Sequence, residues 1–510
     1  MTATQTGNEI HPVLKNRLDL QQSDPQVYAA LLGEEQRQRD GIELIPSENY
    51  TFPEVLAVLG SVFTNKYSEG YPGRRYYGGQ TYTDEIENLA RDRAKAVFRC
   101  EHANVQPLSG SAMNQAVYLG LLEPGDTILA MDLSHGGHLT HGAPVSHMGK
   151  LFNFVRYITN PVDGSIDYDQ IRADAKLHKP KLVLCGYTSY PRDIDYQAFK
   201  SIADEVGALT MTDASHFGGL VAGDAMENPF DHGFDIVTTT THKSLRGPRG
   251  GMVLSRKKFA KKLDKSVFPG LQGGPHMNAI AGIAVTLGKA QTDEFKQYAE
   301  QVLKNSKTLA GALMDQGAEL IAGGTDNHMM VIDTVKSFGL DGKVAEEVLD
   351  QVQITTNKQI IPDDPNPPLK PSGIRIGTPA ATTRGMQEGD MQLLASWLVT
   401  CLKNPGDEAM LAEVAEQVQQ FCQKFPVPGL EESQPKPPHW KSKTSDASPL
   451  AWWAVAKWTC LNSRSWPTGA IPLWSICAKR ARPSRKTKVN WQSKRAWATC
   501  TSPWVATPWS

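Results

Sequence analysis

Three features that would place this chain in a special class are missing. No run of apolar residues approaches the roughly 18 needed to cross a membrane, and the N-terminus has no basic stretch followed by an apolar one. The seven cysteines show no CxxC spacing, which indicates neither a zinc site nor a disulfide framework. With 510 residues, 40% apolar and 21% charged, the composition is that of an ordinary globular protein. We therefore expect a cytoplasmic protein without a membrane segment.

Tryptophan and net positive charge are scarce in residues 1–430 and concentrated after them. Residues 431–510 hold ten of the eleven tryptophans, and their 13 Lys and Arg against 3 Asp and Glu give +10, which leaves −11 for the rest. They show neither a helical nor an alternating period. One interpretation is a nucleic-acid arm whose phosphate contacts are Lys479, Arg480, Arg482, Arg485, Lys486 and Lys488. The preferred interpretation is an appended, disordered tail over 429–510, with no core of its own and no nucleic acid bound.

The stretch from Ile236 to Gly251 is the most informative in the chain. A β-branched run ends in His242-Lys243, and a loop of Gly, Pro and Arg follows. In an open α/β sheet, ligands gather where the strands end. An ammonium group buried there beside arginines has a lowered pKa, which frees its amine to attack an aldehyde. Lys243 is therefore the candidate Schiff-base lysine, although most single lysines are solvated surface residues.

A second strand end supplies an acidic partner. Predicted strands at 181–186 and 208–212 flank a predicted helix at 195–206, which indicates a βαβ unit of a parallel sheet. The second strand ends at Asp213, so Asp213 and Lys243 are expected at one edge of the sheet. A buried carboxylate is costly unless it meets a cation, and a pyridinium nitrogen is such a cation.

A candidate phosphate site precedes the helical stretch 112–122. Ser109-Gly110-Ser111 place hydroxyls and free N–H groups at its N-terminus, although ordinary helix capping is the commoner reason for such a triplet. Together with Lys243 and Asp213, these residues describe a site for pyridoxal 5′-phosphate.

Two loops carry further candidates. His135, His138 and His141 follow a predicted strand at 126–131 and have no Cys or acidic neighbour, so we expect no metal and prefer a histidine stacked on a flat cofactor. Residues 65–79 are rich in Tyr, Gly and Arg and include Glu69. That composition fits ligand binding and a subunit interface equally well.

The chain is expected to divide into four parts. Residues 1–45 are an arm with a helix at 26–39, and 46–300 form a large cofactor-binding domain with a helix at 82–98. Residues 301–428 form a small α/β domain with a strand at 329–333 and helices at 342–352, 391–402 and 408–424. The tail, 429–510, completes the chain.

Four motifs resemble the serine hydroxymethyltransferase family, and the resemblance covers about residues 10–428. They are Lys66–Gly79 (KYSEGYPGRRYYGG), Ser134–Gly142 (SHGGHLTHG), Thr238–Gly251 (TTTTHKSLRGPRGG) and Ser372–Ala380 (SGIRIGTPA). The resemblance implies a fold-type-I pyridoxal-phosphate enzyme, that is, an α/β protein with a mainly parallel seven-stranded sheet and a smaller C-terminal α/β domain. It also implies a homodimer, or a dimer of dimers, with active sites shared between subunits. The reaction that the resemblance implies is the reversible conversion of L-serine and tetrahydrofolate to glycine and 5,10-methylenetetrahydrofolate.

The resemblance further implies a role for individual residues. Lys243 matches the Schiff-base lysine, Asp213 the partner of the pyridinium nitrogen, and His138 the histidine stacked on the ring. Arg375 matches the arginine that grips the substrate carboxylate, and Glu69 the proton-transfer carboxylate lent by the neighbouring subunit. The remaining cofactor positions are Ser109, Gly110, Ser111, Thr188, His216 and His242, with Tyr67 and Gly274 from the other subunit. The remaining candidates are Tyr77 and Thr240 for catalysis, Ser47, Tyr67 and His216 for the substrate, and Leu133, Gly137, His138 and Leu139 for folate.

The departures from the family pattern lie mainly on the folate side. Gln359 stands where the family usually has Asn, and Pro367-Pro368-Leu369 where it often has Ser-Pro-Phe; Ser244 replaces Thr and keeps a hydroxyl. Two other functions stay open on the sequence. One is a folate-independent threonine or phenylserine aldolase with the same cofactor, and the other a catalytically silent scaffold with a nucleic-acid-binding tail.

Overall fold

The computed structural model describes residues 19–430, and the expectations about the basic tail at 431–510 lie outside that range. The helices and strands predicted above are present with ends that agree to within about a turn. The largest difference is in the helix predicted at 391–402, which runs from Glu388 to Lys403. Within the described residues no helix combines the length and the apolar character that a membrane crossing requires.

The larger of two main sheets has seven strands, and only β10 runs against the others. The predicted mainly parallel seven-stranded sheet of an α/β protein is therefore confirmed. In sheet order its strands are β4 (His102–Asn104), β10 (Gly251–Ser255), β9 (Ile236–Thr240), β8 (Leu209–Asp213), β7 (Leu182–Gly186), β5 (Thr127–Met131) and β6 (Asn153–Tyr157).

Continuous burial along the central strands explains why helices surround this sheet. Every residue of β7, β9 and β10 is buried, which is typical of strands covered on both faces. Local signals fix the helices between them: at the start of α8 the Asp195 carboxylate accepts from the Ala198 N–H (2.8 Å), and Gly207, with φ of 69°, ends that helix. The helices of this part are α4 (Thr81–Phe98), α5 (Gly110–Leu121), α6 (Met148–Leu151), α7 (Tyr168–His178), α8 (Tyr196–Val206), α9 (Gly218–Ala222), α10 (Ala260–Lys265) and α11 (Met277–Lys289).

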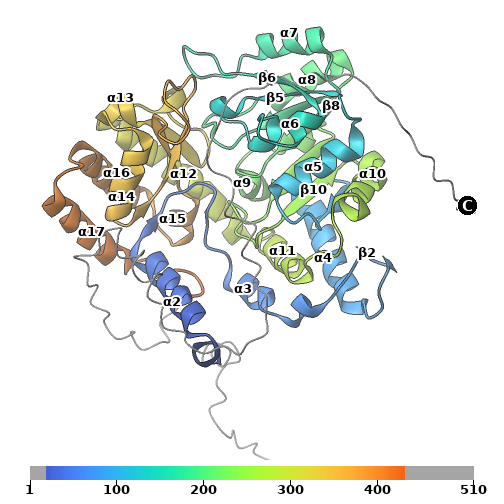
Figure 1. Ribbon diagram of the computed structural model, residues 1–510, viewed down its shortest axis with the longest axis horizontal. Helices are drawn as coiled ribbons and strands as arrows, with labels where there is room; N and C mark the ends of the chain where they lie inside the picture. Colours follow the sequence, from blue (N-terminus) through green and yellow to red (C-terminus); the bar gives the residue numbers. More distant parts are fainter. Residues whose placement is uncertain (1–18, 431–510) are drawn as a thin grey trace, which may run out of the picture. The chain divides into compact units, whose positions relative to one another are not determined.

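A smaller antiparallel sheet follows in the chain and has its own core. In Figure 1 its helices α14, α16 and α17, yellow to orange, form a group beside the large sheet. Leu309, Leu349, Ile374 and Leu398 are among its fully buried side chains. Its strands are β11 (Met329–Asp333), β14 (Gly373–Gly377) and β13 (Asn357–Gln359), and its helices α13 (Thr334–Phe338), α14 (Gly342–Gln351), α15 (Pro379–Thr383), α16 (Glu388–Lys403) and α17 (Glu408–Cys422).

The long helix α12 (Asp293–Asp315) belongs to both cores. Its first half packs Phe295 and Val302 with the large sheet, and its second half packs Leu309 and Leu313 with the small one. The predicted domain boundary at residue 300 falls inside this helix, and the division into two domains stays a prediction. The N-terminal strand β1 (Ile42–Glu43) pairs with β12 (Ile354–Thr355), which joins the start of the chain to the small-sheet core.

The remaining elements are short or lie near the N-terminus. They are the helices α2 (Pro25–Asp40) and α3 (Pro53–Leu59), the hairpin β2 (Gly70–Tyr71) and β3 (Arg74–Arg75), and the short helical turns η1 (Val62–Asn65), η2 (Leu133–His135), η3 (Leu139–His141), η4 (Pro229–His232), η5 (Lys257–Phe259), η6 (Ser266–Leu271) and η7 (Ile321–Gly323).

Arg384 ties three distant segments together. This buried arginine follows α15, and its guanidinium donates to main-chain carbonyls at or just beyond the ends of α2 and α17. Carbonyls at helix ends lack the N–H donors that continue the helix, so the arginine satisfies several of them at once. The acceptors are Gln38 (3.1 Å), Arg39 (3.1 Å), Gly41 (2.7 Å), Cys422 (3.0 Å) and Phe425 (2.8 Å).

We expect Arg384→Ala to lower the free energy of unfolding by about 3 kcal/mol or more, because several buried carbonyls lose their donor at once. The measurement is the midpoint of denaturant unfolding. The control is Arg172→Ala, which removes a surface ion pair to Glu205 (2.9 Å) and should cost less than about 0.5 kcal/mol. Equal effects of the two changes would contradict the role given to Arg384.

Candidate active site

The candidate site lies where the parallel strands end. β5, β7, β8 and β9 run in the same direction, so the segments after them share one edge of the sheet. These segments carry the Leu133–His141 loop, Thr188, Asp213 and Lys243, in the order of their strands. The prediction that Asp213 and Lys243 lie at one edge is confirmed by the pairing of β8 with β9.

Lys243 follows β9 in a segment fixed on both sides. The Asn49 amide donates to the Lys243 carbonyl (3.1 Å), and the Ser244 hydroxyl donates to the His216 carbonyl (2.7 Å). Burial lowers the pKa of the Lys243 ammonium to about 7; the Asp213 carboxylate opposes this shift, and the cations of Arg375 and Arg249 reinforce it. A substantial fraction of Lys243 is therefore a neutral amine near neutral pH.

Asp213 is buried, and several donors hold its carboxylate. Burial raises its pKa, but the hydrogen bonds from His141 and Ser215 outweigh burial, so that the pKa lies well below the usual range. The His138 N–H donates to His141 Nδ1 (3.1 Å), so His141 Nε2 carries the proton and donates to Asp213 Oδ2. The donors are Asn114 Nδ2 (2.8 Å), His141 Nε2 (3.1 Å), Ser215 N (3.1 Å) and Ser215 Oγ (2.6 Å).

The sequence did not reveal that His141 has an acidic partner. Ligand atoms of His138, His141 and Asp213 lie within 4.8 Å of one another, a geometry that a metal ion could use. The Asp213 oxygens accept four hydrogen bonds in this arrangement. The lack of an acidic neighbour in the sequence therefore gives no ground against a metal here, and the expectation that none is bound stays a prediction.

Several buried imidazole nitrogens have no hydrogen-bond partner within residues 19–430. They are Nδ1 of His216, Nδ1 of His242 and both ring nitrogens of His328. The rings of His216 and His328 stack at 5.7 Å, and burial lowers the pKa of His328 to about 3. Burial also lowers the pKa of His138, to about 4. These imidazoles are neutral near pH 7, and unpaired buried nitrogens are typical of a site that binds a polar group.

Arg375 is a buried cation without an acidic partner in the described chain. It lies in β14; its Nη1 donates to the Thr188 carbonyl (2.5 Å) and its Nε to Asn357 Oδ1 (3.3 Å). No carboxylate within residues 19–430 forms an ion pair with it, and burial lowers its pKa to about 10. A buried guanidinium with donors to spare suits an anionic ligand.

The candidate phosphate residues lie at the start of α5, beside β9. Ser109 caps the helix, since its hydroxyl accepts from the Ala112 N–H (3.4 Å). A Cβ at Gly110 would lie 3.0 Å from Thr240 Cγ2, so the glycine allows β9 to approach the helix end closely. The Thr240 hydroxyl donates to the Ser215 carbonyl (3.1 Å), which links this corner to the Asp213 segment.

Tyr67, Glu69, Tyr77 and Gly274 form a separate group. The Tyr67 hydroxyl lies 3.3 Å from Glu69 Oε1, the Tyr67 and Tyr77 rings are 5.0 Å apart, and a Cβ at Gly274 would meet the Tyr67 ring at 3.1 Å. None of the described hydrogen bonds or ring contacts of this group reaches Lys243, Asp213 or Arg375. Within one chain Tyr67, Glu69, Tyr77 and Gly274 therefore contact one another and make no described contact with Lys243.

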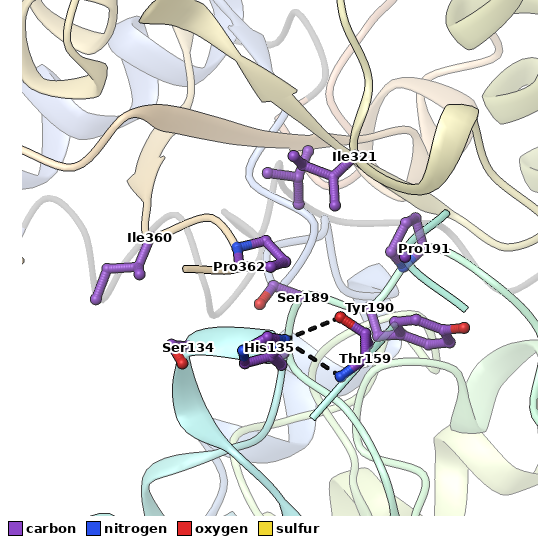
Figure 2. Close-up of a pocket in the computed structure, with 12 residues that line it drawn as sticks. Ser134, His135, Thr159, Ser189, Tyr190, Pro191, Ile321, Ile360 and Pro362 are labelled. Atoms are coloured by element: carbon purple, nitrogen blue, oxygen red, sulfur yellow. Dashed lines mark hydrogen bonds between the residues drawn. The ribbon is translucent and has the colours of Figure 1, made fainter. Parts of the chain in front are cut away.

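The candidate folate residues lie in the loop after β5, and Figure 2 shows the crevice that this loop lines. His135 and Ser134 form its polar side, where the His135 ring bonds to Thr159 (Nδ1 to Oγ1, 2.9 Å), and Ile321, Ile360 and Pro362 lie opposite. Leu133, Gly137 and Leu139 belong to the same loop; Leu139 is exposed, and Gly137 is too close to the Met131 carbonyl to carry a side chain.

Two remaining candidates lie beside β14. Ser47 follows Pro46, whose ring packs on Gly377, and the Gly377 N–H donates to the Leu44 carbonyl (2.8 Å). Gln359, in β13, donates its own amide to the Ile360 carbonyl (3.0 Å).

The fold and the site together define a class of α/β enzyme. In this class a lysine amine and a carboxylate lie near each other where the parallel strands of one sheet end. The family model described as serine hydroxymethyltransferase matches residues 20–398. A relative named serine hydroxymethyltransferase, from Desulfotalea psychrophila (strain LSv54 / DSM 12343), is 52% identical over 412 residues, which are 81% of this chain and 96% of that protein. The chain belongs to the serine hydroxymethyltransferase family, whose members are pyridoxal-phosphate enzymes of fold type I.

We expect the Lys243 amine of cofactor-free protein to react with pyridoxal 5′-phosphate at a rate that rises with pH through a midpoint near 7. The neutral amine is the nucleophile, so the rate follows the deprotonated fraction. Arg375→Ala removes a cation that lowers this pKa and should move the midpoint upward. The absorbance change after mixing, followed across a pH series, measures the midpoint of the parent protein and of Arg375→Ala. A midpoint near the usual lysine pKa of 10.5 in the parent protein would contradict the assignment of Lys243 as the reacting amine.

Proposed function

We propose that this protein catalyses the reversible conversion of L-serine and tetrahydrofolate to glycine and 5,10-methylenetetrahydrofolate, with pyridoxal 5′-phosphate as cofactor. One observation supports this most strongly. A lysine amine with a pKa near 7 and a carboxylate held ionised lie at adjacent strand ends, close to a buried arginine that has no acidic partner within residues 19–430.

The donor set fits the cofactor. The ionised Asp213 suits a protonated ring nitrogen, the unpaired His216 and His242 nitrogens suit the polar groups on the ring, and the free N–H groups at the start of α5 suit a phosphate. When bound, the cofactor accepts the electrons released from the bond that breaks at the substrate's Cα. The residues proposed to hold it are Lys243, Asp213, His138, Thr188, His216, His242, Ser109, Gly110 and Ser111. Thr240 stays a proposed catalytic residue, and its hydroxyl donates to the Ser215 carbonyl (3.1 Å).

In this proposal Asp213 keeps the proton on the ring nitrogen, and its own donors keep Asp213 ionised. His141, Asn114 and Ser215 are the positioning residues for that carboxylate. The neutral His138 offers a flat face without adding a charge that would compete with the ring nitrogen.

Arg375 is proposed to bind the carboxylate of the amino acid. Two parallel N–H donors match a carboxylate better than a lysine ammonium would, and fixing the carboxylate orients the bonds at Cα. Ser47, beside the end of β14, is proposed to add a hydroxyl to the same site.

Glu69, Tyr67, Tyr77 and Gly274 are proposed to complete the site of a neighbouring copy of the chain. This group includes exposed tyrosines, with Tyr67 54% and Tyr77 47% accessible, as expected of a surface that a second subunit covers. Glu69 would then move the proton of the serine hydroxyl. The active enzyme is accordingly proposed to be a homodimer with shared sites.

Leu133, Gly137, His138 and Leu139 are proposed to contact the folate. Their loop contributes Ser134, His135 and Gly136 to the crevice of Figure 2, which Ile321, Ile360 and Pro362 line on the side of the small sheet. The proposed ligands are therefore L-serine, glycine and tetrahydrofolate.

The experiment that tests this function compares substrates. Glycine release from L-serine should require tetrahydrofolate for full rate and should match the folate product one to one. Comparable cleavage of threonine or phenylserine without folate would instead establish a folate-independent aldolase.

We expect Lys243→Ala to lose turnover with little loss of stability, because it removes the imine nucleophile and little buried area. Serine turnover and a thermal melt measure the two properties. Lys66→Ala, which removes a surface lysine that donates to the Gly78 carbonyl (2.7 Å), is the control for losing a lysine and should keep the cofactor bound. Near-normal turnover in Lys243→Ala would show that the central assignment is wrong.

We expect Arg375→Ala and Glu69→Gln to fail at different steps. The first removes charge-assisted hydrogen bonds worth about 1.5–3 kcal/mol each, so the KM for serine should rise by roughly two orders of magnitude. The second keeps amino-acid binding but should lower folate-dependent kcat by roughly 10²–10⁴-fold, because it removes a proton donor or acceptor. Steady-state kinetics at varied serine separates the two, and equal loss of serine binding in both would refute the division of roles.

A further inference from the structure

Two chain segments meet at one end of the crevice drawn in Figure 2, where Pro191 and Ile321 lie near each other. One is residues 187–193, directly after β7, and the other is residues 321–328, directly before β11. The hydrogen bonds between them are concentrated on a few side chains. We refer to the contact made by Asn327, Thr325 and Asp326 with Tyr187 and residues 190–193 as the clasp.

Asn327 is the centre of the clasp. It is fully buried, and its amide donates to the Tyr187 hydroxyl (3.0 Å) and to the Tyr190 carbonyl (3.1 Å). Its side-chain oxygen accepts from the Met329 N–H (3.0 Å), at the first residue of β11. One side chain therefore joins the start of the small sheet to both sides of Thr188 and Ser189.

A second set of contacts reinforces the first. Arg192 Nη1 pairs with Asp326 Oδ1 (3.0 Å), and the Asp326 N–H donates to the Pro191 carbonyl (2.9 Å). The Thr325 hydroxyl also lies within hydrogen-bond distance of the Pro191 carbonyl (3.2 Å), although the Met329 carbonyl is nearer (2.5 Å). The two segments are therefore fixed to each other along several residues and not at one point.

Thr188 lies in sequence between Tyr187 and Tyr190, the two residues that Asn327 bonds to, and Arg375 donates to Thr188. The Thr188 carbonyl accepts from Arg375 Nη1 (2.5 Å), and the Thr188 N–H donates to the Gly136 carbonyl (2.7 Å) in the Leu133–His141 loop. Arg375 itself lies in β14, which pairs with β11 at Val331. Asn327 therefore joins β11 to the segment that contains Thr188, Thr188 bonds to Arg375, and Arg375 lies in the strand that pairs with β11.

We propose that Asn327 is a positioning residue for amino-acid binding: by holding Tyr187 and Tyr190 it fixes the Thr188 carbonyl, which in turn sets where the Arg375 guanidinium is presented. The inference rests on the proposed function, in which Arg375 binds the substrate carboxylate. A guanidinium that is free to turn pays an ordering cost when the carboxylate binds, so loosening the clasp weakens affinity and leaves the chemistry largely unchanged.

The chain offers a closely matched control in Asn305. It is equally buried, and its amide also donates to one hydroxyl, Thr382 Oγ1 (2.9 Å), and one carbonyl, Met386 O (2.8 Å). It joins α12 to α15 and touches neither segment of the clasp. Asn305→Ala therefore removes one hydrogen bond to a hydroxyl and one to a carbonyl, as Asn327→Ala does, but at a place that has no contact with Thr188.

The experiment measures glycine binding to the full-length holoenzyme by calorimetry, together with serine kinetics and a thermal melt. We expect Asn327→Ala to raise the Kd for glycine and the KM for serine about tenfold, with kcat within about threefold. Asn305→Ala should lower the melting temperature by a similar amount, with Kd and KM within about twofold of the parent protein. Equal affinity in the two variants would overturn the proposal.

A second variant covers the case in which Asn327→Ala does not fold. Tyr187→Phe removes only the hydroxyl that accepts from Asn327 and keeps the ring that packs on Phe217 (4.9 Å). It should raise the Kd for glycine about threefold, and an unchanged Kd would overturn the proposal. Failure of the parent protein to bind glycine or serine at all would instead contradict the proposed function, so the two failures are distinguishable.

Discussion

The burial of Lys243 and Asp213 at one edge of the large sheet is the constraint on which the rest of the site depends. Each charged group taken out of water costs several kcal/mol unless other groups compensate for the lost solvent. The two residues meet this cost differently. Asp213 stays ionised because donors surround it, whereas Lys243 approaches neutrality because burial and two arginines disfavour its charge. One arrangement therefore provides both an anion and a neutral amine, which are the two groups that the proposed cofactor site requires.

The fold brings these groups together because the parallel strands β5, β7, β8 and β9 all end on the same side. Hydrogen bonds from Asn49 to the Lys243 carbonyl and from Ser244 to the His216 carbonyl hold the segment after β9 in place. The small sheet contributes Arg375 from β14, and that cation must reach across to the Thr188 segment. If Arg375 binds the amino acid as proposed, the affinity of the site depends on the contacts that join the small-sheet core to the Thr188 segment.

Local sequence patterns predicted most of the fold and the centre of the site. Continuous β-branched and apolar runs marked the buried strands, and their ends placed Asp213 and Lys243 correctly, because the direction of a parallel strand fixes which end faces the ligand. Contacts between distant residues could not be predicted this way. The His141 bond to Asp213 joins positions 72 residues apart, and the Asn327 bond to Tyr187 joins positions 140 apart. No spacing rule relates such pairs, since only the folded chain makes them neighbours. The helix α12 packs in both cores, so the domain boundary predicted at residue 300 falls inside a helix.

The claim that Lys243 is the covalent anchor of the cofactor can be tested directly by borohydride reduction of the purified protein, followed by mass analysis of its peptides. Reduction makes an imine between the lysine and the cofactor permanent, so the modified peptide identifies the residue. If Lys243 is the anchor, a single phosphopyridoxyl group is expected on the peptide that contains Lys243. The same group on a different lysine, or no modified peptide in protein shown to contain the cofactor, would contradict it.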